Sequence, residues 1–236
     1  LISGSPGDRR RFLDWGAFHW SGGVASVFSS FRRAMLQRNT LLRNGIIDQT
    51  TLDPWDLQVV TTGSQIDAWR REFLQDIEPR FVRLCSELGL GIDLSLSFKN
   101  GWGDEDLEVV LKKTRVRDIK ARTSTQGPQR ADFEVLRVTQ RAVDTLSRGQ
   151  LKIANLALVL AQLQAAGSRG IEPILCLDDI GAELDTSFLE RVWSQILSAN
   201  AQVLATGITT DRIGLSDAAV EKANVFHVKR GMIELM

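Results

Sequence analysis

Two adjacent carboxylates, Asp178 and Asp179, follow the apolar run of residues 174–177 (ILCL). Such a run predicts a buried strand, and open α/β folds bind ligands at the carboxyl ends of their strands. One carboxylate there can hold the water shell of Mg²⁺ beside a triphosphate, and a second can orient or deprotonate an attacking water. Taken alone, the stretch is equally compatible with a strand that ends in two solvated acids.

A second candidate lies upstream, where residues 146–150 (LSRGQ) lead into a strongly apolar helical run. Ser147 is a suitable N-cap, and Gly149 lets a ligand approach the backbone closely. The first turn of a helix presents unpaired N–H groups and a partial positive charge, which suit an anion such as a γ-phosphate. An ordinary capped core helix is the alternative interpretation.

The elements that must position these residues can be predicted from the spacing of the apolar residues. Helices at 147–166 and 186–198 alternate with strands at 173–178 and 201–208. This alternation predicts a mainly parallel α/β sheet. A hairpin at about 224–236 is expected to turn at Arg230-Gly231.

The first half of the chain shows a different pattern, typical of two long amphipathic helices. The first is expected at 26–43, and the second from Asp53-Pro54 to about residue 88, with Pro79 kinking or dividing it. Together they predict a helical hairpin, an arm, in which Trp55 and Trp69 serve packing rather than base stacking. Further elements are a strand at 92–98, a helix at 106–119 and a strand at 132–138.

The composition is that of an ordinary globular protein: 43% of the 236 residues are hydrophobic and 25% are charged. The 29 basic and 29 acidic residues cancel, which argues against nucleic-acid binding by net charge alone. The sequence has neither an apolar run of membrane-spanning length nor a signal-peptide layout. Cys85 and Cys176 are predicted to be buried, reduced thiols, so we expect a cytoplasmic protein. Because the chain starts without Met, we expect a fragment of a longer one.

Several stretches carry a more specific resemblance. Residues 146–150 resemble the LSGGQ signature of ATP-binding-cassette ATPases, with Arg148 in place of the first glycine. Residues 10–19 (RRFLDWGAFH) resemble the arginine-led FLDWG-x-FH stretch of RecF proteins, and residues 37–42 (QRNTLL) resemble their QRN-x-LL helix. Residues 125–132 (TQGPQRAD) resemble the RecF loop T-x-GPHRAD, with Gln129 where His is usual. The resemblance to the RecF family extends from residue 1 to about residue 210.

The resemblance implies an ATPase head, related to those of Rad50 and the SMC proteins, that dimerises around two ATP molecules. Asp178 would be the Mg²⁺ carboxylate, and Asp179 the catalytic, water-orienting one. The signature residues would contact the γ-phosphate bound by the partner subunit: Ser147, Arg148, Gly149 and Gln150. The loop across the dimer interface would be Gly181, Ala182, Glu183, Leu184 and Asp185. Thr206 matches the switch position where many cassette ATPases have His, although a plain strand-end Thr fits equally well.

One part of such a site is absent from the sequence. No glycine precedes a lysine, so the phosphate-binding motif G-x-x-x-x-G-K-[ST] does not occur in these 236 residues. RecF proteins carry this loop in an N-terminal segment. We therefore expect the chain to hold half of a nucleotide site and to be inactive alone, whereas the full-length protein would be a weak, DNA-stimulated ATPase.

DNA contacts are predicted from basic runs, which bind phosphates without regard to sequence. The candidates are Arg9, Arg10, Arg11, Lys112, Lys113, Arg115 and Arg117. The alternative is a solvated helix face whose charge is offset by the acidic residues 104–108.

Together these features predict an α/β fold: the C-terminal lobe of a cassette-type ATPase head with a helical-hairpin arm. Residues 1–25 would end the N-terminal ATPase segment, 26–120 would form the arm, and 121–236 the lobe. The function implied by the resemblance is recombinational DNA repair: gap repair and RecA loading with RecO and RecR, ATP-driven dimerisation on DNA, and a part in replication and the SOS response. The alternatives are a Rad50- or SMC-like chromosome-maintenance head and a non-catalytic scaffold with a vestigial site.

Overall fold

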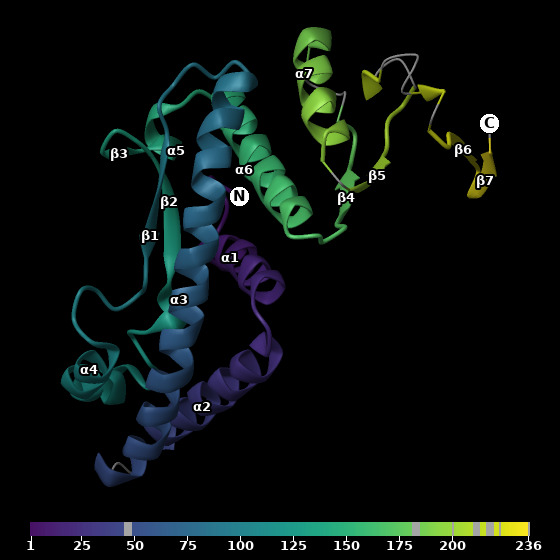
Figure 1. The fold of residues 1–236 in the computed structure, drawn as a ribbon. Coiled ribbons are helices and arrows are strands. Elements are labelled where there is room, and N and C mark those ends of the chain that lie inside the picture. Colours follow the sequence, from purple (N-terminus) through teal and green to yellow (C-terminus); the bar gives the residue numbers. More distant parts are fainter. Residues whose placement is uncertain are drawn as a thin grey trace.

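The structure, a computed structural model, describes residues 1–44, 49–180, 185–199, 201–209, 213–215, 220–221 and 223–235. Its central element is helix α3, Gln49–Glu87, against which α1, α2, α4 and α6 all pack (Figure 1). Helix α2, Val24–Asn44, forms the expected helical hairpin with α3.

Helix α3 differs from the sequence-based expectation at its start, and Pro79 does not divide it. It begins at Gln49 rather than at Asp53-Pro54, and it continues through Pro79 without a break. Proline in a helix interior removes one backbone hydrogen bond, at a cost of about 3 kcal/mol. Pro79 lies on the exposed face, while the opposite face is fully buried at Phe73, Ile77, Phe81 and Leu84. The packing of that buried face keeps the helix continuous.

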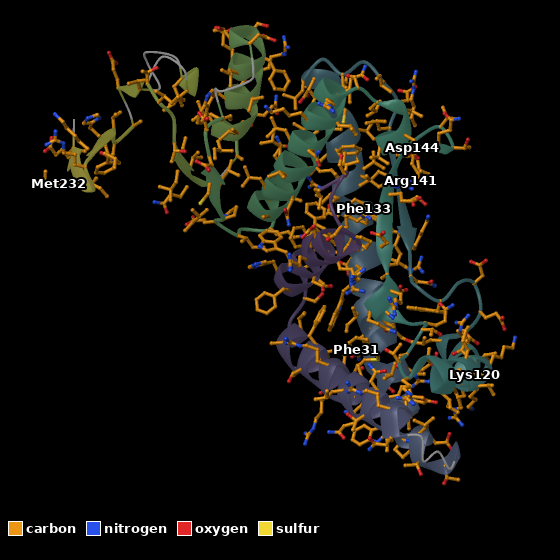
Figure 2. All side chains as sticks on the ribbon, turned by 180° about the vertical axis from the view of Figure 1, so that it is seen from behind. Phe31, Lys120, Phe133, Arg141, Asp144 and Met232 are labelled. Carbon is orange, nitrogen blue, oxygen red and sulfur yellow. The ribbon has the colours of Figure 1, made fainter. Side chains whose placement is uncertain are left out.

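Two hydrophobic clusters lie along α3, and the side-chain view shows one labelled phenylalanine in each (Figure 2). The arm cluster contains Phe31 and packs α2 and α3 against α4, Leu107–Ala121, with Trp55 and Trp69 at its edge as expected. The larger cluster contains Phe133 and joins α1, Pro6–Trp20, to α6, Arg148–Ser168. Because α3 contributes side chains to both clusters, the arm and the part that contains α1 and α6 share one continuous helix.

A small antiparallel sheet covers the upper part of α3. Strand β1, Ser95–Lys99, pairs with β2, Asp132–Arg137, which also pairs with the short β3, Gln140–Arg141. The short 3-10 helix η1, Pro128–Arg130, leads into β2, and α5, Ala142–Thr145, leads from β3 toward α6. These strands place the start of α6 at one end of the molecule (Figure 1).

The remaining elements alternate as predicted. Strand β4, Ile174–Leu177, pairs in parallel with β5, Gln202–Ala205, and α7, Thr186–Leu197, connects them. A hairpin of β6, Phe226–Lys229, and β7, Met232–Leu235, turns at Arg230-Gly231, whose φ angles of 51° and 81° suit a tight hairpin turn. Within the described residues only β4 and β5 pair in parallel; the other pairings are antiparallel.

The β4–β5 pair is covered on one face only. Leu175 is buried, whereas Ile174, Cys176 and Leu204 lie on the opposite face and are exposed. The expected burial of Cys176 is therefore wrong, because alternate strand residues point to opposite faces. Cys85 is buried as predicted, and burial raises the pKa of its thiol to about 12. No helix within the described ranges is long and apolar enough to cross a membrane.

Candidate nucleotide site

Thr206, just after β5, forms hydrogen bonds to both acidic residues that follow β4. Its backbone N–H donates to the carbonyl of Leu177 at 2.9 Å, which extends the β4–β5 pairing beyond the strands. Its hydroxyl donates to Oδ1 of Asp178 at 2.6 Å and accepts from the backbone N–H of Asp179 at 3.1 Å. The parallel pairing of β4 and β5 thus brings together three residues that the sequence analysis selected separately.

Asp179 has an unusual backbone conformation for a residue with a side chain. Its φ of 48° lies in the left-handed region, which Asp tolerates better than most residues because its short side chain is polar. Strained backbone of this kind is frequent at functional sites and costs on the order of 1–3 kcal/mol. The side chains of both Asp178 and Asp179 are exposed, so both are open to a ligand.

The residue types at the end of β4 fit Mg²⁺ in the way nucleotide sites hold it. In the described part of the chain, no group of three or more His, Cys, Asp or Glu side chains forms a complete metal cage. Mg²⁺ in phosphate-transfer sites needs no such cage, because one or two carboxylates suffice with water and phosphate oxygens. Asp178, oriented by Thr206, and Asp179 supply that number of carboxylates.

The signature residues form a complete N-cap of α6. Ser147 Oγ accepts from the backbone N–H of Gln150 at 3.3 Å, and Gln150 Oε1 accepts from the backbone N–H of Ser147 at 2.9 Å. This reciprocal capping box confirms the predicted N-cap role of Ser147. Ser147, Arg148 and Gly149 are exposed, and the space beside Gly149 is open. The start of α6 is therefore an exposed helix N-terminus that can accept an anion.

The two motifs are separate within one chain. The signature lies at the α5 end of α6, whereas β4 follows the opposite end of that helix (Figure 1). At about 1.5 Å per residue, the 21 residues of α6 extend roughly 31 Å. No hydrogen bond or ion pair among the described residues joins the signature to the acidic pair.

Most of the predicted interface loop, residues 181–184, lies outside the described residues. Its last member, Asp185, is the N-cap of α7 and accepts from the backbone N–H of Phe188 at 2.8 Å. The hydroxyl of Ser187 also donates to Asp185 at 2.7 Å, and this bond, together with that from Phe188, lowers the pKa of the Asp185 carboxyl. Asp185 therefore has a structural role at the start of α7.

The basic residues predicted to contact DNA fall into two groups. Arg9 and Arg115 are largely covered, with side-chain exposures of 11% and 12%. Arg9 forms a bidentate pair with Asp132, and Arg115 pairs with Asp53 and Asp56. The others expose more of their side chains or extend from exposed helix surfaces: Arg10, Arg11, Lys112, Lys113 and Arg117. Acidic neighbours offset the charge of three of them, because Arg11 pairs with Asp8, Lys112 with Glu108 and Lys113 with Glu105.

A buried ionic cluster, which the sequence analysis missed, holds the arm together. We name it the Arg38 cluster: Arg38 donates to Asp56 at 2.6 Å, to Asp118 at 2.8 Å and to Ser124 at 2.7 Å. The side chains of Arg38 and Asp118 are completely buried. One signal was present in the sequence, because Arg38 falls on the apolar face of its helix, in line with Ala34 and Leu42.

Comparison with known proteins gives a consistent result, although no model of a protein family matches the chain. The DNA replication and repair protein RecF of Marinomonas sp. (strain MWYL1) is 34% identical over 237 residues, which cover 100% of this chain. RecF of Xanthomonas axonopodis pv. citri (strain 306) is 38% identical over 99% of the chain. The chain spans 64% of the length of each relative.

The fold agrees with the sequence comparison. A solved structure of the recombination mediator protein RecF–ATP in the RecFOR pathway superposes with a TM-score of 0.84 at 21% identity. That superposition covers 100% of this chain and 64% of the solved one. The predicted fold class, the C-terminal lobe of a cassette-type ATPase head with a helical-hairpin arm, is confirmed. Over its whole length the chain is therefore homologous to RecF, a DNA replication and repair protein, of which it spans 64%.

Proposed function

We propose that this chain supplies the acidic pair and the signature helix of a RecF-type ATPase that acts in recombinational DNA repair. The observation that carries the proposal is the arrangement of Asp178, Asp179 and Thr206 at adjoining strand ends. The exposed, capped N-terminus of α6 supports it, because it offers an anion site at a distance from the acidic pair.

In this proposal the two carboxylates have different roles. Asp178, held by the Thr206 hydroxyl, would bind Mg²⁺, which neutralises charge on the phosphates of ATP. Asp179 would orient the attacking water and accept its proton. Its left-handed backbone conformation turns the chain directly after Asp178, so the two carboxylates need not point the same way.

The separation of the two motifs supports a site shared between subunits. The signature helix would contact the γ-phosphate of an ATP held by the partner subunit, so ATP would drive dimerisation. The phosphate-binding loop would come from a segment outside these 236 residues, and the chain alone would neither bind ATP tightly nor hydrolyse it. DNA, in particular gapped junctions, and RecO- and RecR-type proteins that load RecA are the proposed partners, in the cytoplasm.

The experiment compares Asp178→Asn with Asp179→Asn in a full-length protein that carries the loop. Asp179→Asn should slow hydrolysis by about 100-fold or more, because an amide accepts no proton, while ATP-dependent dimers persist. Asp178→Asn should instead weaken Mg²⁺–ATP binding. Glu190→Gln, an equally conservative change at an exposed residue of α7, is the matched control and should leave both quantities unchanged.

Equal effects of the two Asp→Asn changes on nucleotide binding and turnover would contradict these roles. Wild-type rates for both variants would show that the acidic pair takes no part in hydrolysis, and no hydrolysis by the full-length wild-type protein would favour the non-catalytic scaffold. Binding of ATP by the 236-residue chain alone, measured by calorimetry with micromolar affinity, would refute the half-site proposal.

A further inference from the structure

A cavity of about 430 Å³ lies between α1, α2, α3 and η1, far along the chain from the nucleotide site. Helix α1 contributes Arg10, Asp14 and Phe18, which lie on one face because they are four residues apart. Helix α2 contributes Phe28 and Arg32, also four residues apart. The volume is within the range of small-molecule sites in proteins, roughly 300–1,000 Å³.

Two of the stretches that carry the RecF resemblance meet at this cavity. Arg10, Asp14 and Phe18 belong to residues 10–19, and Gln129 belongs to the loop at 125–132. Neither stretch contributes to the acidic strand or to the signature helix. The cavity therefore brings together two of the resembling stretches, residues 10–19 and 125–132, at a place separate from the nucleotide site.

The walls of the cavity combine aromatic rings with guanidinium groups. Phe18 is 56% exposed, so much of its ring is available for stacking. Arg32 is exposed at the rim and is held by a bond of 3.4 Å from its Nε to the carbonyl of Phe28. Arg10 donates from Nη1 to the carbonyl of Ala131 at 3.0 Å. Aromatic rings with arginines beside them suit a nucleobase and its phosphate.

The back of the cavity is ordered by an ion pair between a buried arginine and a partly exposed carboxylate. Arg70, only 4% exposed, donates to Asp14 at 2.7 Å and to the carbonyl of Pro128 at 2.7 Å. Arg70 thus compensates the charge of Asp14, the one carboxylate among the lining residues. Arg10 and Arg32 therefore give the cavity a net positive charge. A phosphate is therefore favoured over a cationic ligand.

Gln129 provides a polar group that lacks a partner. Its Nε2 donates to the carbonyl of Gln126 at 2.7 Å, while its Oε1 is buried and makes no hydrogen bond within the described residues. A buried acceptor without a partner costs free energy. An N–H donor of a bound base would supply the missing partner.

We propose that this cavity holds one unstacked nucleotide of a single-stranded DNA segment. The base lies against Phe18 and Phe28, the Gln129 amide accepts from its polar edge, and Arg10 and Arg32 contact the adjoining phosphates. Phe18 and Arg32 are both exposed, so the cavity is open to solvent and the strand can continue past it. This assignment rests on the DNA binding in the proposed function and adds a specific contact site to it.

The test measures binding of a fluorescein-labelled strand of about 12 nucleotides to the 236-residue chain by fluorescence anisotropy. Phe18→Ala should weaken binding about tenfold by removing a stacking surface, whereas Phe18→Tyr should retain it. Arg32→Glu should weaken binding by a similar factor. Arg33→Glu is the matched control, because it makes the same charge change at the next exposed residue of α2, outside the cavity lining; it should stay within about twofold of wild type.

A second arm identifies the source of the nucleotide. The free mononucleotides should bind more weakly than the strand, because they lack the flanking phosphates, and mononucleotide binding as tight as that of the strand would overturn the assignment to DNA. Unchanged strand binding by Phe18→Ala and Arg32→Glu would overturn the cavity as a DNA site. Equal losses for Arg32→Glu and Arg33→Glu would also overturn it, since they would reflect overall charge alone.

The failure of this inference is distinguishable from failure of the proposed function. ATP-driven dimerisation of the full-length protein should be unchanged by Phe18→Ala, because Phe18 lies outside the acidic strand and the signature helix. If the wild-type chain binds the strand but the cavity variants bind equally well, only the cavity assignment falls. If the wild-type chain binds no strand, both the cavity assignment and this chain's role in DNA binding fall.

Discussion

The hydroxyl of Thr206 donates to Oδ1 of Asp178 across the ends of two parallel strands, at 2.6 Å. The same hydroxyl accepts from the backbone N–H of Asp179 at 3.1 Å. One small side chain thus orients the proposed metal ligand and the backbone of the proposed catalytic residue. Thr206 therefore contacts both members of the acidic pair.

We expect Thr206→Val to impair a full-length protein by removing the hydroxyl while keeping the shape of the side chain. Hydrogen bonds to charged groups contribute about 1.5–3 kcal/mol, so ATP hydrolysis should fall about tenfold or more. Thr206→Ser keeps the hydroxyl and should retain most of the activity. The steady-state ATPase rate checks this. A wild-type rate for Thr206→Val would assign Thr206 a plain strand-end role.

Changes at Ser147 can separate a helix cap from a phosphate contact. Ser147→Asp keeps a good N-cap acceptor, so we expect the thermal stability to be unchanged. Its added negative charge, however, should repel a γ-phosphate, and ATP should no longer drive dimerisation of the full-length protein. Ser147→Arg should also abolish the dimer, through bulk. Light scattering with and without ATP measures dimerisation, and thermal denaturation measures stability.

A mixing experiment then tests whether the signature acts on the partner subunit. The Ser147→Arg protein keeps its own phosphate-binding loop, and a second variant defective only in that loop keeps its signature. Their mixture should form one complete composite site and recover ATP-dependent dimers. Dimers formed by Ser147→Arg alone would leave Ser147 with the structural capping role only.

Loss of the central cation of the Arg38 cluster should strongly destabilise the arm. Arg38→Ala leaves the fully buried Asp118 without its cation, and breaking such a pair costs about 3–5 kcal/mol. Arg33→Ala, on the exposed side of the same helix, should change the free energy of unfolding by less than about 0.5 kcal/mol. Urea denaturation of both variants gives the comparison. Similar stabilities would contradict the structural role of the cluster.

The packing of α1 on α3 depends on a glycine. A Cβ added at Gly16 would lie 2.2 Å from the ring of Phe73, which is fully buried. Gly16→Ala should therefore lower the free energy of unfolding by about 1–3 kcal/mol through overpacking. The double variant Gly16→Ala with Phe73→Leu should recover part of that loss. A stabilised Gly16→Ala protein, as helix propensity alone would give, would contradict the close contact.

Local chemistry explains what could be predicted from the sequence. Apolar spacing located α2, α6 and α7, and the apolar runs located β4 and β5, because burial of one face imposes a period on the chain. Ser147 as N-cap and Arg230-Gly231 as hairpin turn were predictable for a different, equally local reason. Each depends on hydrogen bonds or φ angles within a few residues.

The relationships that depend on tertiary structure have no comparable local signal. Arg38 and Asp118 are 80 residues apart, and Asp178 and Thr206 are 28 apart; packing of whole elements brings each pair together. Pro79 remains inside α3 because the buried face of that helix outweighs a local penalty. The basic run containing Arg115 looked free to bind DNA, yet Asp53 and Asp56 neutralise that arginine. Residue types and local order follow from the sequence, whereas the partner of each charge is decided by the burial of surfaces far apart in the chain.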